Sequence, residues 1–214
     1  MSQKSANKII IFDLDGTIID SERLAANVMV QVFQEMGVPL RAEEADLVVG
    51  RTWDSALDFL KQRHSFDLDG AHLRDRVMES YRVQRSKAIS AVPGVVNSIR
   101  SLSSRLPLAV VSGSDREDIE WALQTLAIGS CFQFYLGSED YSSSKPSPEG
   151  YLLAAERLGV SPSEILVFED SEAGIQAARR AGMAVIAVQC TNYFGMDQSQ
   201  ADGQISDFSK VNLD

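Results

Sequence analysis

Short apolar runs recur along the chain and predict strands that are buried on both faces of a sheet. These runs are "IIIF" (9–12), "PLAVVS" (107–112), "CFQFYLG" (131–137), "EILVFED" (164–170) and "AVIAV" (184–188). Continuous apolar runs, as opposed to alternating ones, are typical of parallel strands that helices cover on both sides. Between the later runs, apolar residues recur at helical spacing, as at Ile119, Leu123 and Leu126. This alternation predicts an α/β fold with a Rossmann-like, doubly wound parallel sheet.

The region between residues 20 and 88 interrupts the alternation, because it contains no strand-like run. It is made of the helical patterns "SERLAANVMVQVFQEMG", "RAEEADLVVG", "TWDSALDFLKQRHS" and "LDGAHLRDRVMESYRVQRSK". The alternation resumes with "ISAVPGVVNSIRSL" at 89–102. We therefore predict a core formed by residues 1–18 and 89–214, with residues 19–88 inserted after the first strand as a small helical domain.

The composition is that of a globular protein, with 44% hydrophobic and 23% charged residues among 214. The formal net charge of −10 argues against nucleic acid or an anionic membrane surface as a partner, since both attract clustered basic residues. No apolar stretch reaches the roughly 18 residues of a membrane span, and "MSQKSANK" lacks the apolar segment of a secretory signal. We therefore expect a cytoplasmic protein in which Cys131 and Cys190 are free thiols.

Polar residues follow several of the predicted strands. They are Asp13 and Asp15 after the first, Ser112 and Gly113 after the second, Lys145 beyond the third, and Glu169 and Asp170 at the end of the fourth. In an open parallel sheet, ligands bind beyond the carboxyl ends of the strands. We therefore expect these side chains to gather at one edge of the sheet.

The chemistry of this set points to a phosphate ester and a metal ion. Clustered carboxylates suit a hard cation with oxygen ligands, which predicts Mg²⁺. Ser112 and the Gly113 amide, before a helix, suit a phosphate group, and Lys145 would neutralise more of its charge. One aspartate can then act as a nucleophile and the other as an acid for the leaving oxygen.

Four motifs at these places resemble those of a known family. They are "DLDGT" (13–17), "VSGS" (111–114), "SSKPSP" (143–148) and "EDSEAGIQAARRAGM" (169–183). In order and spacing, over the whole chain, they are similar to the four signature motifs of the haloacid dehalogenase superfamily of phosphohydrolases. The inserted helices resemble the small cap of the β-phosphoglucomutase-like branch.

The resemblance implies a role for each matching position. Asp13 would attack phosphorus, and Asp15 would be the general acid and then the general base. Asp13, the backbone carbonyl of Asp15 and Asp170 would hold Mg²⁺, with Glu169 as a further candidate ligand. The candidates for binding the phosphoryl group or the rest of the substrate are Ser112, Gly113, Lys145, Thr17, Arg51 and Arg116. Residues 17–20 and 90–94 would be the hinges of the cap.

The resemblance leaves the acceptor of the phosphoryl group open. A mutase needs a second, basic phosphate site, but Arg51 comes earlier than the corresponding mutase arginine and Asp115 stands where a basic residue would help. Arg116 could compensate. We favour a phosphatase acting on a small phosphorylated metabolite such as a sugar phosphate, as a monomer or a dimer. A β-phosphoglucomutase-type mutase, and a non-catalytic binding or regulatory protein on the same fold, are the alternatives. The segment "FGMDQS" (194–199) matches no motif.

Overall fold

The core of the protein is a six-stranded parallel sheet. The computed structural model describes residues 9–38, 40–41, 44, 53–64, 70–88 and 90–211. The strands are β1 (Ile9–Phe12), β4 (Leu108–Val111), β5 (Phe134–Leu136), β6 (Ile165–Glu169), β7 (Ala184–Val188) and β8 (Gly203–Ile205), in the spatial order β5-β4-β1-β6-β7-β8. All neighbouring pairs are parallel. The predicted α/β fold with a parallel sheet is thereby confirmed.

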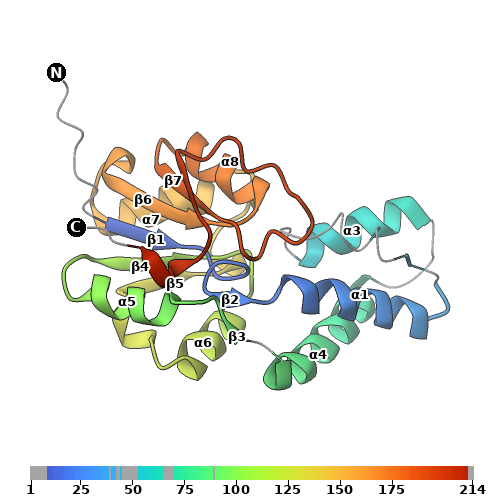
Figure 1. Ribbon diagram of the computed structural model, residues 1–214. Coiled ribbons are helices and arrows are strands. Elements are labelled where there is room, and N and C mark those ends of the chain that lie inside the picture. Colours follow the sequence, from blue (N-terminus) through green and yellow to red (C-terminus); the bar gives the residue numbers. More distant parts are fainter. Residues whose placement is uncertain are drawn as a thin grey trace.

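Helices cover both faces of this sheet (Figure 1). They are α5 (Val95–Ser103), α6 (Arg116–Thr125), α7 (Glu149–Leu158) and α8 (Glu172–Arg180). Short 3-10 helices lie at Gly129–Cys131, Ser138–Asp140, Pro162–Glu164 and Phe208–Lys210. Alternate residues of β1 point to opposite faces: Ile10 and Phe12 join the cluster that contains α5 and α6, whereas Ile9 and Ile11 join the cluster that contains α7 and α8. The apolar run at 9–12 is therefore explained by burial on both sides.

Three described helices within residues 22–88 form a separate group beside the sheet (Figure 1). These are α1 (Glu22–Glu35), α3 (Trp53–His64) and α4 (Gly70–Ala88). They share a hydrophobic cluster of their own, which includes Val32, Phe33, Leu60 and Val77. Two short antiparallel strands, β2 (Ile19–Asp20) and β3 (Ser90–Ala91), join the group to the core. We call this helical group the cap; its predicted limits at residues 19 and 88 stay a prediction.

The strand and helix limits differ from the sequence-based expectation at a few places. The run at 131–137 forms a strand only over Phe134–Leu136, because a 3-10 turn occupies Gly129–Cys131. Strand β8 was not predicted, since "GQI" is short and has a polar centre. Most of the helix expected at 41–50 lies outside the described residues.

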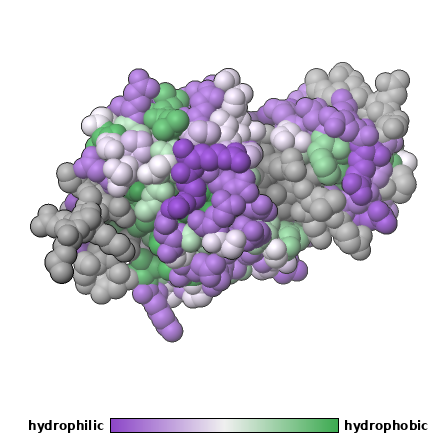
Figure 2. All heavy atoms as spheres, turned by 90° about the horizontal axis from the view of Figure 1, so that it is seen from above, coloured by the Kyte–Doolittle hydropathy of each residue, from purple (hydrophilic) through white to green (hydrophobic). Residues whose placement is uncertain are grey.

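The face of the molecule seen in Figure 2 is hydrophilic over most of its described part. Figure 2 shows hydrophilic side chains over most of the coloured area, with apolar ones scattered among them. None of the helices in the described ranges has the length and apolar character needed to cross a membrane.

Candidate active site

A buried lysine connects two of the predicted strand-end carboxylates. Asp13 follows β1, and its backbone amide donates to the carbonyl of Phe168 in β6 at 3.0 Å. Lys145 reaches the same place from the loop before α7, with Nζ 2.6 Å from Asp13 Oδ1 and 2.5 Å from Glu169 Oε1. The lysine also donates to the carbonyl of Val111 at the end of β4, at 3.3 Å. Three strand ends therefore meet at one ammonium group.

Glu169 has protein donors on both of its carboxylate oxygens. Oε1 accepts from Lys145 and, at 3.0 Å, from the hydroxyl of Tyr151. Oε2 accepts from the amides of Asp170 and Ser171 and from the Ser171 hydroxyl, each at 3.0 Å. This carboxylate is completely buried. Its bonds suit a residue that fixes Lys145 and the 169–171 turn in place.

Asp170 differs from Glu169, because its buried Oδ2 makes no hydrogen bond with any described residue. Gly16 faces it across the site: a Cβ at Gly16 would overlap the Asp170 carboxylate, and the glycine adopts φ +75°. A residue with a side chain would be both strained and too large there. Ligand oxygens of Asp13, Glu169 and Asp170 lie within 4.8 Å of one another.

The close carboxylates have altered pKa values. Burial raises the pKa of Asp13 well above its usual range; Lys145 lowers it, and Glu169 and Asp15 raise it further. Burial also raises the pKa of Asp170, and the neighbouring Glu22 adds to the effect. Burial lowers the pKa of Lys145, but attraction to Asp13 and Glu169 raises it overall, so the ammonium stays charged. Negative charge exceeds positive charge at this edge of the sheet.

The residues present fit a divalent cation. An orphaned, buried carboxylate oxygen on Asp170 and the nearby carboxylate of Asp13 are hard oxygen donors, which Mg²⁺ prefers. A cation would also offset the repulsion that raises the pKa values of these two carboxyl groups. Asp13 and Asp170 are thus the side chains best suited to hold it, and Glu169, whose oxygens are already bonded, is suited to an indirect role.

Asp15 lies among hydroxyl groups. Its Oδ1 accepts from Ser21 at 2.7 Å, and its Oδ2 accepts from Ser114 at 2.5 Å and from Ser112 at 3.4 Å. The backbone of Ser112 is fixed in turn, because its carbonyl accepts from the hydroxyl of Tyr141 at 2.7 Å. Neutral hydroxyl donors thus hold the side chain of Asp15 in place.

The other predicted binding residues are less closely associated with this cluster. Gly113 follows Ser112 directly, and its amide makes no hydrogen bond with a described residue, so it can serve an incoming group. Thr17 is fully buried and its hydroxyl is likewise unbonded among the described residues. Arg116 contacts Asp140 instead and lies over the ring of Tyr135. Arg51 lies outside the described residues.

Sequence reasoning missed several residues of the site. Glu22, the first residue of α1, is buried, and its pKa is raised to about 8 by burial and then by Asp15 and Asp13. Ser21 and Ser114 bond Asp15, and Tyr151 bonds Glu169. The second serine of "VSGS" was a usable signal for Ser114, because it lies in a predicted motif. Glu22 gave no such signal, since an acidic residue in a first helical turn is ordinary.

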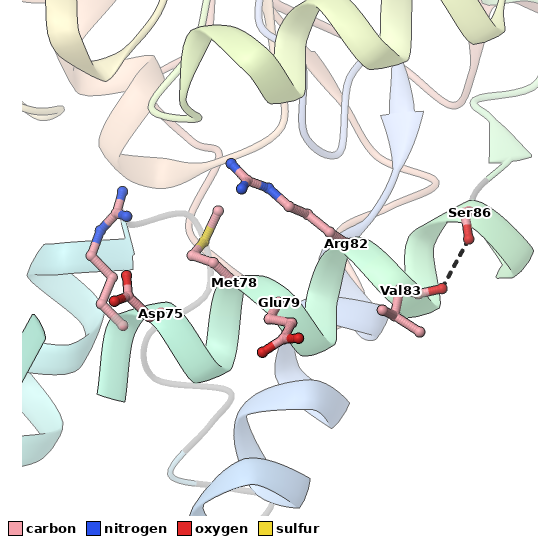
Figure 3. A pocket seen from close by; sticks show the side chains of 7 residues that line it. Asp75, Met78, Glu79, Arg82, Val83 and Ser86 are labelled. Carbon is pink, nitrogen blue, oxygen red and sulfur yellow. Dashed lines mark hydrogen bonds between the residues drawn. The ribbon is translucent and has the colours of Figure 1, made fainter. Parts of the chain in front are cut away.

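The cap contacts the core beside this site through α4. Arg74 donates to both carboxylate oxygens of Asp115, at 2.9 and 3.1 Å, and Arg82 donates to Asp118 at 3.2 Å. A groove of about 630 Å³ runs along α4, and in Figure 3 Met78 and Arg82 extend from the same side of this helix. Asp115, where a mutase would favour a basic residue, is therefore paired with a cap arginine.

A second groove, of about 480 Å³, lies between α3 and the segment that leads to Lys145. Its walls carry Asp54, Ser55, Asp58, Phe59 and Gln62 from α3, and Ser138, Tyr141, Ser142 and Ser144 from the core. Hydroxyl, amide and carboxylate groups predominate, which suits a polar, hydroxylated molecule.

The chain resembles proteins of one known family. The family model described as "Haloacid dehalogenase-like hydrolase" matches residues 10–188. The chain is 32% identical over 206 residues to validoxylamine A 7'-phosphate phosphatase of Streptomyces hygroscopicus subsp. limoneus, covering 95% of each chain. It is also 32% identical over 181 residues to fructose-1-phosphate phosphatase YqaB of Escherichia coli (strain K12), covering 84% of this chain and 95% of that one.

A solved structure has a similar overall fold. It is that of a putative β-phosphoglucomutase from Thermotoga maritima, with a TM-score of 0.72 and 25% identity over 92% of this chain and 94% of that one.

Proposed function

The chain belongs to the haloacid dehalogenase-like hydrolase family, and on this premise we propose that it is a Mg²⁺-dependent phosphatase acting through an aspartyl-phosphate on Asp13. The observation that carries the proposal is the meeting of Asp13, Lys145 and Asp170 at one edge of the sheet. The site thereby combines a candidate nucleophile, a cation that can attract phosphate, and carboxylate oxygens that can bind a metal ion. The general activity, hydrolysis of a phosphoric monoester, follows from the family and from the relatives that are named as phosphatases.

In the first half of the reaction, a carboxylate oxygen of Asp13 forms a bond to phosphorus as the ester P–O bond breaks. Lys145 occupies Oδ1 of Asp13, which leaves Oδ2 for the attack. The proton for the departing alcohol oxygen comes from Asp15, and the hydroxyls of Ser112 and Ser114 orient that carboxyl group. The products are the free alcohol and a phosphorylated Asp13.

In the second half, water attacks phosphorus. Asp15, now a carboxylate, takes the proton from this water, and the bond between phosphorus and Asp13 breaks to release phosphate. We expect the positive charge of Lys145 and the amide of Gly113 to stabilise the phosphoryl oxygens in both halves of the reaction. When bound at Asp13 and Asp170, Mg²⁺ would supply positive charge that lets an anionic ester approach these carboxylates.

The substrate proposed is a small phosphorylated metabolite with a hydroxylated carbon skeleton, such as a sugar phosphate. The two relatives described above are named as phosphatases of validoxylamine A 7'-phosphate and of fructose 1-phosphate. The groove between α3 and the 138–144 segment, with its polar walls, could receive the alcohol part. Cap helices beside the site would exclude bulk water during turnover, as lids do in other enzymes. The cytoplasmic location remains a prediction.

The mutase alternative rests on the β-phosphoglucomutase fold and is separable by one assay. Phosphorylated metabolites, including fructose 1-phosphate and both glucose monophosphates, would be incubated with the protein and Mg²⁺, and phosphate release and isomerisation would be scored together. We expect phosphate release that stops when EDTA removes the metal. Interconversion of hexose phosphates without phosphate release would contradict a phosphatase. A protein inert across the panel would favour the non-catalytic alternative.

A further inference from the structure

The loop between β7 and β8 contacts both the catalytic core and the cap. In Figure 1 this loop leaves the end of β7 and extends from the sheet toward α3 and α1. We call residues 191–198 the brace. It includes most of the "FGMDQS" segment, which matches no motif.

At its two ends, the brace holds backbone carbonyls of the active site. The hydroxyl of Thr191 donates to the carbonyl of Gly16 at 2.5 Å, directly after Asp15. The side-chain amide of Gln198 donates to the carbonyl of Asp170 at 2.5 Å and to that of Val188 at 2.9 Å. Both side chains are buried. The brace is therefore anchored to the two loops that carry Asp15 and Asp170.

Between these anchors, the brace has a fixed internal shape. Asn192 donates from Nδ2 to the carbonyl of Met196 at 2.9 Å, and its Oδ1 accepts from the Met196 amide at 2.7 Å. Gly195 adopts φ +66°, which favours glycine at the turn between them. A segment closed on itself in this way can transmit a displacement from one end to the other.

The tip of the brace contacts the hinge and the cap. The hydroxyl of Tyr193 donates to Asp20 Oδ2 at 2.7 Å, and the guanidinium of Arg23 lies 5.2 Å from the centre of the tyrosine ring. Asp20 belongs to β2, one of the two short strands between core and cap, and Arg23 belongs to α1. Phe194 packs against the hydrophobic cluster of the cap. The tip thus holds both sides of the junction between core and cap.

We propose that Tyr193 and Phe194 are positioning residues that hold the cap at a fixed distance from the metal and phosphate site. This inference rests on the proposed phosphatase function for its kinetic consequence only. The brace is a further connection between core and cap, in addition to the β2–β3 pair and to the ion pairs that Arg74 and Arg82 of α4 make with the core. If the cap must be held in one arrangement to cover the alcohol part of the substrate, weakening the tip lowers the population of that arrangement. The apparent affinity for the substrate falls by the same factor.

The first test compares two tyrosine variants that each lose one hydroxyl. Tyr193→Phe removes the bond to Asp20, and Tyr135→Phe is the matched control, because Tyr135 bonds Glu120 within the core. Hydrogen–deuterium exchange would be measured over residues 17–24 and 86–92. We expect faster exchange in Tyr193→Phe and none of this acceleration in Tyr135→Phe. Equal exchange in the two variants would overturn the proposal, even for a protein without phosphatase activity.

The second test separates positioning from plain stabilisation. With p-nitrophenyl phosphate as substrate, we expect Tyr193→Phe to raise KM by about two- to tenfold, the factor that one hydrogen bond is worth, with kcat unchanged. The inhibition constant of inorganic phosphate, which has no alcohol part, should not change. Phe194→Ala should act in the same direction, and Phe194→Leu should restore KM because it restores apolar packing. Faster exchange with an unchanged KM would reduce the brace to a structural element and contradict its positioning role. If the wild-type protein hydrolyses no ester, the proposed function fails. The exchange experiment still shows whether the brace holds the cap against the core.

Discussion

The ammonium of Lys145 lies 2.6 Å from Oδ1 of Asp13, although 132 positions separate the two residues in the chain. Lys145 holds Glu169 at the same time, at 2.5 Å. The lysine is therefore the one cation that the described structure places among these buried carboxylates. Its positive charge offsets the repulsion between the carboxylates, and its hydrogen bond fixes the position of Asp13, the proposed nucleophile.

Replacing Lys145 by methionine should lower both stability and activity. The variant leaves Asp13 and Glu169 buried without their cation, and breaking a buried ion pair in this way costs about 3–5 kcal/mol in free energy of unfolding. Hydrolysis of p-nitrophenyl phosphate should be lost as well, because no ammonium remains for the phosphoryl oxygens. Urea unfolding without metal and a phosphate-release assay would measure the two effects.

The double variant Lys145→Met/Glu169→Gln is the control for this prediction. Removing the Glu169 charge together with the lysine should restore part of the lost stability and none of the activity. Equal stability of Lys145→Met and the wild type would show that the lysine is not the counter-ion inferred from its contacts.

Replacing Asp13 by asparagine should abolish turnover and leave the fold intact. The amide has a similar shape but cannot form an acyl phosphate, and it removes a charge whose burial is unfavourable. Phosphate release and the thermal melting curve would be measured on the same sample. Loss of the folded state would mean that Asp13 is a structural residue, and retained turnover would exclude it as the nucleophile.

The Asp15→Asn variant should show an effect that depends on the leaving group. Asp15 is expected to protonate the alcohol oxygen, so hydrolysis of an alkyl ester such as a hexose phosphate should slow by about 10²- to 10⁴-fold. p-Nitrophenol leaves without a proton, so p-nitrophenyl phosphate should be affected less. A steady-state comparison of kcat for the two esters is the measurement. Equal losses would argue against the acid role.

The polar residues at the strand ends could be predicted from the sequence because parallel strands share one direction. Once "IIIF", "PLAVVS" and "EILVFED" are interpreted as parallel neighbours, their carboxyl ends must meet, and Asp13 and Asp170 with them. The approach of Lys145 was predictable only from the order of the motifs, because a lysine in a loop is ordinarily solvated. Its bonds to both Asp13 and Glu169 are a tertiary fact.

Other parts of the site carried no pattern that a sequence reveals. The contact of Arg116 with Asp140 depends on how α6 and the 138–140 turn are placed. The sequence suggested that Arg116 would bind the substrate instead. The brace consists of single polar contacts between distant segments, such as Thr191 with Gly16. Isolated contacts of this kind have no period or spacing along the chain, so only the folded structure shows them.

The stability of the metal-free protein should depend on Glu22. Its pKa is raised from 4.5 to about 8, first by burial and then by repulsion from Asp15 and Asp13. Between these two values the folded state keeps a proton that the unfolded chain has released. The free energy of unfolding therefore falls as pH rises from about 4.5 through about 8. The stabilisation that protonated Glu22 gives the folded state is fully present below about pH 4.5 and is lost above about pH 8.

Glu22→Gln should remove this dependence, because the amide cannot ionise. Melting temperatures in EDTA would be recorded from about pH 5 to about pH 8.5, and each 1 kcal/mol corresponds to about 2–4 °C for a chain of this size. The variant should melt above the wild type at the alkaline end, with the gap closing toward acidic pH. Glu156→Gln, at an exposed position of α7, is the control and should follow the wild type.

Mg²⁺ should narrow the gap, since the cation offsets the repulsion that Glu22 meets on ionising. A constant difference between Glu22→Gln and the wild type across the pH range would mean that Glu22 does not titrate there, and the acidic cluster would then lack the excess charge that makes a cation necessary.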